Sequence, residues 1–292
     1  MQVSNIFGLP TPFVEACKSD YEPTPKRYSV TTILGGLTKA VLQRRHFHEL
    51  SEDASESVWK IFGQAVHKIL EESPHSEHEE VENFLTLDMP GGYTMSGRFD
   101  LYDSERQTVV DYKTCSVYKL LYHEFDDWAA QVAAYCLMLR ANGKPCDSGQ
   151  IVAIIKDHSK AKAKFESNYP EHPVAVIDFH FDEDQLAYYE QMFRDAFGAL
   201  RHLEKLADEE LPPCDPESRW ATPTKYAVMK KGRKRAVKLY DDKAEADIHA
   251  IQVGGYVEIR EGTDRKCTDY CGVCQWCRYW QDRYGGDSDA DE

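Results

Sequence analysis

The stretch GRFDLYDSERQTVVDYKT, Gly97–Thr114, decides the fold of this chain. β-Branched and aromatic residues are frequent in the segments Tyr93–Asp103 and Thr108–Thr114, which predicts two strands. The polar residues Ser104–Gln107 between them suit a turn. We therefore expect a β-hairpin at this point.

This hairpin places two carboxylates opposite each other. In the register that the turn sets, Asp103 faces Thr108 and, three rungs further in, Asp100 faces Asp111. Opposed side chains have Cβ atoms about 5 Å apart, and Lys113 joins the same face. Two like charges at about 5 Å repel by roughly 3 kcal/mol at an effective dielectric constant of about 20, which the lysine offsets only in part.

A divalent cation removes this repulsion. Carboxylate oxygens with open coordination positions suit Mg²⁺ or Mn²⁺. Such an ion can generate hydroxide and stabilise a phosphoryl transition state, while Lys113 orients the water or steadies the developing charge. The residues alone equally allow an exposed hairpin with solvated acids and a surface lysine.

Composition sets the broad class of the protein. The chain has 292 residues, of which 42% are hydrophobic, enough for one large α/β domain or a domain with an appendage. It has no run of 18 apolar residues, no signal-peptide pattern and no GxxxxGK[ST] motor motif, so we expect a cytoplasmic protein without membrane contact. The net charge of −15 argues against binding of nucleic acid by the surface as a whole, so a polyanion must meet a local basic groove.

Helix and strand patterns follow the hairpin on both sides. Apolar residues at helical spacing predict a helix with one buried stripe at Ser55–Glu72, and a nearly all-apolar helix at 126–141, capped by Asp126 or Asp127. We interpret the acidic run Pro74–Glu82 as a solvated connection. Further strands are predicted at Gln150–Lys156 and Val174–Phe181, and further helices at Ser29–Gln43 and Asp184–Ala207. A mixed sheet flanked by helices follows.

Polar residues on two of these helices are candidates for the site. His67 lies at the edge of an apolar stripe, where a packed or surface histidine is the ordinary explanation. Gln131 and Tyr135 lie one turn apart on one face, and either form core hydrogen bonds or face the same cleft as the acids.

The composition shifts after Leu211-Pro212-Pro213. The segment Lys225–Tyr240 predicts a hairpin that turns near Gly232, followed by a helix around 241–251 and a strand YVEIRE, together a ββαβ appendage. This is the most basic stretch of an acidic chain. Two explanations of these cations are equally good: they contact phosphates of a nucleic acid, or they protect an exposed edge strand from aggregation. The cations assigned to DNA are Lys230, Lys231, Arg233, Lys234 and Arg235.

Cysteines are concentrated in CTDYCGVCQWC near the end of the chain. Nine cysteines in a chain without a secretion pattern indicate reduced thiols or metal ligands. Four thiols within eleven residues are a strong ligand signal that suits either zinc or an iron-sulfur cluster. The four are Cys267, Cys271, Cys274 and Cys277, and Cys214 in the Pro-rich junction is a fifth candidate.

The chain is therefore predicted to divide into five parts. These are an extended lead-in (1–28), a core (29–211), a basic appendage (212–262), a cysteine segment (263–281) and an acidic disordered tail (282–292).

Four motifs in this order resemble a known family. GQAVHKILEE, GRFD, VVDYKT and QVAAY resemble the RecB-like branch of the PD-(D/E)XK nucleases, which includes CRISPR-adaptation nucleases and phage-encoded relatives. The resemblance implies a restriction-endonuclease-like fold. It also implies that His67, Asp100, Asp111 and the carbonyl of Tyr112 bind the catalytic metal, that Lys113 activates the water, and that Gln131 and Tyr135 belong to the active site.

The resemblance extends to the cysteines. Cysteine-bearing members of the family carry a [4Fe-4S] cluster, which implies ligands at Cys267, Cys271 and Cys277. The fourth ligand is then Cys214 or Cys274. We favour Cys214, because one short loop rarely surrounds a cluster unaided, and Zn²⁺ remains the alternative.

The resemblance implies a Mg²⁺- or Mn²⁺-dependent DNA exonuclease acting on ends or single strands in recombination, repair or phage DNA metabolism. Without a motor it is expected to act alone or beside a helicase or recombinase. The alternatives are a CRISPR-adaptation-type nuclease that trims spacer precursors, and a DNA-binding scaffold without catalysis.

Overall fold

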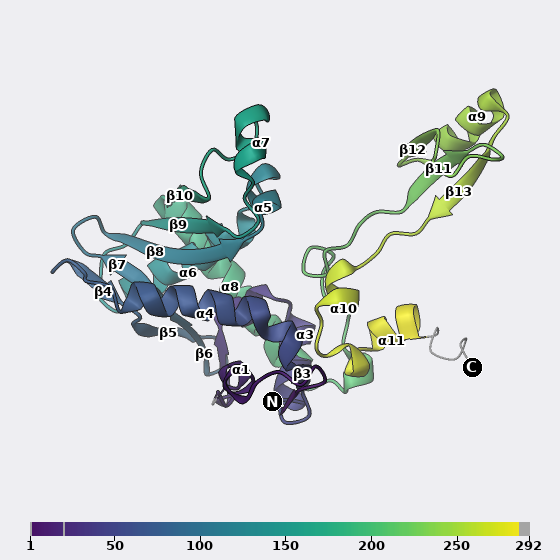
Figure 1. Cartoon of the computed structure of the whole chain (residues 1–292). Helices are drawn as coiled ribbons and strands as arrows, with labels where there is room; N and C mark the ends of the chain where they lie inside the picture. The colour runs from purple at the N-terminus through teal and green to yellow at the C-terminus, as the bar shows by residue number, and fades with distance from the viewer. Residues whose placement is uncertain (1, 20, 286–292) are drawn as a thin grey trace. The chain divides into compact units, whose positions relative to one another are not determined.

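The computed structural model describes residues 2–19 and 21–285. The chain forms two compact units, Met1–Leu206 and Ala207–Glu292, each described below by itself (Figure 1). No helix in the described part of the chain has the length and apolar character needed to cross a membrane.

A five-stranded mixed sheet is the centre of the first unit. Its strands, in the order β10-β9-β8-β7-β4, are β10 (Val174–His180), β9 (Ser148–Ile155), β8 (Thr108–Cys115), β7 (Leu101–Asp103) and β4 (Glu79–Val81). Strands β8 and β9 are parallel, and the other neighbours are antiparallel. A parallel pair needs a crossover, which here contains α5 (Val117–Leu121) and α6 (Asp126–Ala141). The predicted mixed α/β fold is confirmed.

The hairpin has the predicted register at its turn, where Asp103 pairs with Thr108, but the ladder ends at Leu101 and Val110, so the expected pair of Asp100 with Asp111 does not form within it. The single strand predicted at 93–103 is wrong. The chain forms β6 (Tyr93–Arg98), leaves the ladder at Phe99 and Asp100, and resumes as β7. Strand β6 belongs to a second, three-stranded sheet, between β2 (Arg27–Ser29) and β5 (Phe84–Met89).

Two chain crossings connect these sheets. Strand β4 pairs with β7 in the large sheet, and β5 pairs with β6 in the small one. The chain passes from β4 to β5 at Glu82 and Asn83, and returns from β6 to β7 at Phe99 and Asp100. The backbone N–H of Glu82 donates to the carbonyl of Asp100 at 3.1 Å, so both crossings lie side by side.

Helix α6 is buried against the large sheet, as its apolar sequence predicts. Gly149 of β9 lets the helix approach, because a Cβ at this position would lie 2.1 Å from Cγ1 of Val132. The predicted N-cap is wrong: Phe125 precedes the helix, and the two aspartates lie in its first turn, where they favour the positive helix end. Helix α8 (Glu183–Leu203) begins with a capping box between Asp182 and Gln185.

Helix α4 (Val58–Glu71) runs alongside β8 (Figure 1). Its predicted buried stripe is wrong, because no residue of the helix is buried. Trp59 is 58% exposed and Ile69 is 66% exposed. The helix was therefore predicted correctly from its spacing, but its apolar face is not buried in the fold.

The predicted extended lead-in is also wrong in part. It contains α1 (Thr11–Cys17), which has a proline in its first turn, and β1 (Gln2–Ser4), which pairs with β3 (Ser51–Asp53). Ser29 caps α2 (Val30–Leu34) as expected, but glycines at 35 and 36 separate it from α3 (Leu37–Arg45). The short helix α7 (Lys160–Phe165) completes this unit.

The second unit contains the predicted ββαβ appendage. Its sheet has the order β12-β11-β13 and packs on a helix through Val228, Ala246 and Ala250. The elements are β11 (Lys225–Met229), β12 (Lys238–Tyr240), α9 (Lys243–Val253) and β13 (Tyr256–Arg260). Gly232 supplies the positive φ of the turn, at +85°.

A buried aspartate organises the rest of this unit. Asp264 forms an ion pair with Arg219 at 2.6 Å and accepts hydrogen bonds from the hydroxyls of Tyr279 and Tyr284 at 2.6 and 2.8 Å. It thereby holds together the segment after Cys214, α10 (Arg265–Asp269) and α11 (Arg278–Tyr284). The predicted disordered tail is helical in its first residues, within α11, and its part at 286–292 lies outside the described residues.

Candidate metal site

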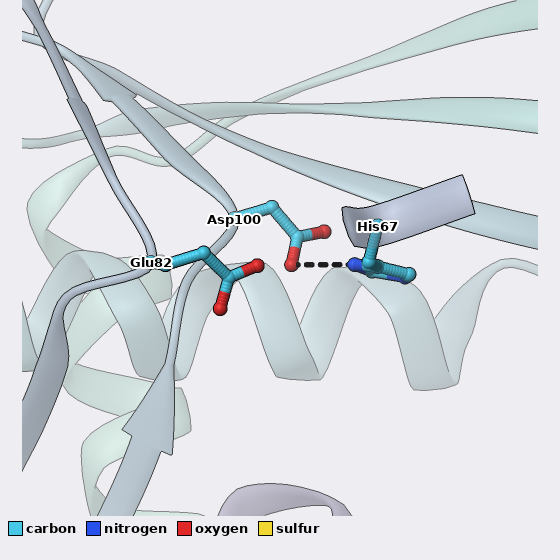
Figure 2. Close-up of side chains that lie close together, drawn as sticks. All are labelled: His67, Glu82 and Asp100. Atoms are coloured by element: carbon cyan, nitrogen blue, oxygen red, sulfur yellow. Dashed lines mark hydrogen bonds and ion pairs between the residues drawn. The ribbon is translucent and has the colours of Figure 1, made fainter. Parts of the chain in front are cut away.

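Two acidic side chains meet one histidine where the chain crosses between the sheets. Nδ1 of His67 on α4 lies 3.0 Å from Oδ1 of Asp100, and one ligand atom each from His67, Asp100 and Glu82 lie within 4.8 Å of one another (Figure 2). Asp100 is fixed from its other side, because Tyr112 of β8 donates its backbone N–H to Oδ2 at 2.6 Å. The three side chains form the histidine cluster.

Glu82 has an unusual backbone conformation. Its φ of +51° lies in the left-handed region, which non-glycine residues seldom adopt and which costs about 1–3 kcal/mol. Its carboxylate lies beside Arg98 at 3.7 Å as well as beside Asp100. Of the four crossing residues, the one with positive φ is therefore Glu82, whose carboxylate belongs to the histidine cluster.

A second group of polar residues surrounds Asp111 on β8. Lys113 places Nζ 2.7 Å from Oδ2 of Asp111, and Gln131 on α6 donates from Nε2 to Oδ1 at 3.0 Å. The same Nε2 donates to the hydroxyl of Tyr135 at 2.9 Å. Helix α6 thus holds Asp111 in one orientation, and we refer to these four residues as the lysine cluster.

Electrostatics connect the two clusters. Burial raises the pKa of Asp111 to about 6, with the charges of Lys113 and Asp100 acting in opposite directions. The hydrogen bond to Asp100 raises the pKa of His67. Burial and the nearby Asp100 carboxylate raise the pKa of Glu82. Three carboxyl groups are thus crowded in a poorly solvated place, which favours a bound cation.

One buried oxygen supports this assignment directly. Oδ2 of Asp111 is buried and lies 2.7 Å from the ammonium of Lys113, without a hydrogen bond of good geometry among the described residues. A second positive charge, from a cation, would stabilise the ionised carboxylate further. Carboxylate oxygens with one imidazole nitrogen are donors that Mg²⁺ and Mn²⁺ accept. The residues present fit a divalent cation.

The predicted site residues therefore come together from distant parts of the chain. The structure brings His67 to Asp100, and Lys113 and Gln131 to Asp111. Glu82 was missed, because it ends the acidic run Pro74–Glu82 that was interpreted as a solvated connection; that interpretation is wrong for β4, which lies within the run. Its isolated position between two short strands gives no periodic signal.

A groove of about 460 Å³ leads to the histidine cluster. Its walls include Trp59, Gly63 and His67 of α4 and, at the site, Glu82 and Asp100. Its volume lies within the range of ligand sites in proteins.

The cysteine segment lies in the second unit, together with Cys214. Burial raises the pKa of Cys267 to about 12, and the neighbouring thiols of Cys271, Cys214 and Cys277 act in the same direction. Cys274 is influenced by Cys271 and Cys277. Within the described residues, no three cysteine sulfurs lie mutually within 4.8 Å.

The predicted DNA-binding cations lie in the loop between β11 and β12. Lys231, Arg233, Lys234 and Arg235 are exposed, and Lys230 is half-buried.

Comparisons with known proteins bear on the whole chain. A family model described as the PD-(D/E)XK nuclease superfamily matches residues 19–280. The chain is similar to SSO0001 (18% identity, covering 64% of this chain and 84% of that one, TM-score 0.46). It is also similar to the alkaline exonuclease LHK-Exo from Laribacter hongkongensis (10% identity, 62% and 90% covered, TM-score 0.37) and to a phage related exonuclease from Haemophilus somnus 129PT (12% identity, 56% and 82% covered, TM-score 0.31). No curated protein matches the chain.

Proposed function

The chain belongs to the PD-(D/E)XK nuclease superfamily, and from this membership we propose that it is a Mg²⁺- or Mn²⁺-dependent deoxyribonuclease. Its mixed α/β fold is the restriction-endonuclease-like fold of that superfamily. The observation that carries the proposal is the buried Asp111, with one oxygen held by Gln131 and the other facing Lys113, next to the histidine cluster. The hydrolysed bond is a phosphodiester.

The residues of the site have separate roles. His67, Glu82 and Asp100, whose ligand atoms lie together, would hold the cation. Asp111 and the carbonyl of Tyr112 are the further proposed ligands. When bound, the cation lowers the pKa of a water and offsets charge on the phosphate. These carboxylates are already fixed by Tyr112, Gln131 and His67, so little rearrangement precedes binding.

Lys113 acts on the substrate side. Its side chain is 24% exposed, and its ammonium lies 2.7 Å from the Asp111 carboxylate, which orients it. From this position Nζ can donate a hydrogen bond to the attacking water or to the non-bridging oxygen on which charge develops. Gln131 and Tyr135 position the carboxylate.

We propose that cleavage proceeds from DNA ends or within single strands. The groove has a volume of about 460 Å³ and runs along α4 to the histidine cluster, which suits a single strand. A free end or an unpaired strand can place its phosphate at the two clusters. This is the feature that favours exonuclease action.

The test is a time course on end-labelled single- and double-stranded DNA and on closed circular DNA, with Mg²⁺, Mn²⁺ or chelator. We expect cleavage of linear DNA, none with chelator, and a loss of at least about 100-fold in Lys113→Ala. Lys205→Ala, which removes an exposed lysine just after the end of α8, is the matched control. Cleavage that survives both Lys113→Ala and Asp111→Ala contradicts the assigned site, and wild-type protein that only binds DNA indicates a scaffold.

We further propose that Cys214, Cys267, Cys271 and Cys277 hold a [4Fe-4S] cluster. The interaction of Cys267 with the other three thiols supports this set. The resemblance to cysteine-bearing members of the family favours the iron-sulfur cluster over a zinc ion, which four thiolates could also hold.

Protein purified without oxygen should be coloured and contain iron and sulfide. Cys214→Ser should lower the iron content, and Cys274→Ser should not; the reverse result exchanges the fourth ligand. Cys115→Ser, in the first unit, is the control. Colourless protein that contains zinc decides for the alternative.

We also propose that the loop between β11 and β12 contacts DNA phosphates. Its exposed cations form a positive region in an acidic protein. Replacing Arg233, Lys234 and Arg235 by alanine should reduce the salt dependence of DNA affinity, by about 0.7–0.9 in the logarithmic slope for each phosphate that is no longer neutralised. An unchanged slope assigns the cations to protection of the sheet edge.

A further inference from the structure

The groove beside the metal site follows one face of α4 for most of the helix. Its lining begins at Trp59, continues through Gly63 and His67, and ends at Glu82 and Asp100. Gly63 lies in its wall, where a Cβ would make an ordinary van der Waals contact of 3.6 Å with the hydroxyl of Thr114 on β8. A chain-like ligand can therefore lie along the helix, with one part at the metal site and another at Trp59.

Trp59 is exposed in a way that suits a planar ligand. It is 58% exposed although it lies in a groove. The ring of Phe62 meets it edge-on, with centroids 6.3 Å apart and an angle of 89°. Nζ of Lys156 lies 4.2 Å from its ring centroid. The ammonium therefore covers one face of the indole, and a base would stack on the opposite face. Aromatic rings with nearby cations bind single-stranded nucleic acids through base stacking and phosphate contact.

The charges along the groove agree with a polyanionic ligand. Lys60 lines it near Trp59, and Nζ of Lys156 lies over the Trp59 ring. Lys68 and Arg98 also line it, but they form ion pairs with Glu71, Glu72 and Glu82. Positive charge is therefore available to phosphates at the Trp59 end, and the proposed cation would offset the carboxylates at the other end.

The length of the path gives the number of nucleotides. Trp59 and His67 are eight residues apart on one helix, which corresponds to about 12 Å. Stacked nucleotides follow one another at about 3.4 Å. The platform therefore lies roughly three to four nucleotides from the phosphate at the metal site.

We propose that Trp59, with Lys156, is a base-stacking subsite for single-stranded DNA, about three to four nucleotides from the scissile phosphate. This inference rests on the proposed nuclease function, whose site it extends. It assigns the exposed side of α4 to the substrate, and it makes a short unpaired strand the unit that the enzyme holds.

The experiment measures binding without cleavage. Fluorescent twelve-nucleotide single strands are titrated with full-length protein in chelator, using wild type, Trp59→Ala, Trp59→Phe and Tyr188→Ala. Tyr188 is 66% exposed on α8, outside the groove, and is the matched control. Stacking on one aromatic ring contributes enough that Trp59→Ala should weaken binding by about 5- to 150-fold, with a smaller loss in Trp59→Phe and none in Tyr188→Ala. Circular dichroism checks that each variant is folded.

A set of strands with one abasic position each completes the test. In wild type, an abasic site about three to four nucleotides from the bound end should weaken binding by a similar factor. In Trp59→Ala, an abasic site at the same position should leave the affinity unchanged. The proposal is overturned if Trp59→Ala binds like wild type, if the two losses multiply independently, or if wild type does not bind these strands. A changed oligomeric state with unchanged DNA affinity also overturns it, and assigns this side of α4 to a protein contact.

The same strands with Mg²⁺ separate this proposal from the proposed function. If wild type cleaves them while Trp59→Ala binds normally, the subsite is wrong and the nuclease assignment stands. If the abasic site weakens binding in wild type and not in Trp59→Ala, but no strand is cleaved, the subsite stands and the nuclease assignment is wrong.

Discussion

Replacing Asp111 by asparagine should make the metal-free protein more stable. Burial raises the pKa of this carboxyl group from its ordinary value of 3.8 to about 6. A raised pKa means that the folded protein prefers the protonated form, so ionisation costs stability as pH rises from about 4 to about 6, and the full cost remains above that range. A shift of about two units corresponds to about 3 kcal/mol.

The asparagine side chain keeps an oxygen that can accept the hydrogen bond from Gln131, and it removes the charge. We therefore expect the free energy of unfolding of Asp111→Asn to exceed that of wild type by about 3 kcal/mol at pH 8 in chelator, which for a unit of this size is about 6–12 °C in Tm. The difference between the two proteins should vanish near pH 4. Urea or thermal unfolding at several pH values measures it, and Asp88→Asn, an exposed site with the same change of charge, is the control.

Metal should reverse the order of stability. Added Mn²⁺ should stabilise wild type by binding the folded state, and should have little effect on Asp111→Asn. The reasoning is refuted if the variant is no more stable than wild type at pH 8 in chelator, or if the difference between them does not depend on pH. The buried charge would then be compensated within the protein, and the case for a cation would lose its main support.

Three further results are expected. Glu82→Gln should weaken Mn²⁺ binding by about 10- to 100-fold in calorimetry while the metal-free fold is retained, since a carboxylate is lost from the histidine cluster; equal affinity excludes Glu82 as a ligand. Because the pKa of His67 is raised, protons should compete with metal already above pH 6.5, so affinity should fall by about tenfold per pH unit below that raised pKa; an affinity that is flat from pH 8 to pH 6 contradicts this. Gly149→Ala should cost about 1–3 kcal/mol, because its Cβ would overlap Val132, whereas Gly198→Ala on α8, with open space around it, should be neutral or stabilising in thermal unfolding.

The sequence predicted the parts of the fold that local patterns control. The turn after Asp103 set the register of β7 and β8, and the apolar run in α6 predicted its burial. The apolar run also gave the bounds of α6, although its N-cap was predicted wrongly, and a glycine located the turn at Gly232. These features depend on neighbours in the chain, so a pattern of one or two turns or strands is sufficient.

The sequence could not predict features that depend on distant contacts. The break at Phe99 and Asp100 has no glycine or proline to mark it, and it exists because Asp100 takes the backbone N–H of Tyr112. Glu82 joins the site through pairing of strands on either side of it. The exposure of α4 likewise depends on whether other elements of the fold cover its apolar face. Helical spacing in the sequence does not predict this.

The two crossings between the sheets have a consequence for biosynthesis. Glu82 and Asp100 reach their places only when the large and the small sheet have both formed, and His67 arrives with a separate helix. A nascent chain that has completed only one sheet therefore lacks a complete set of ligands. If these residues hold a cation, metal binding is therefore a property of the folded unit and not of any one segment.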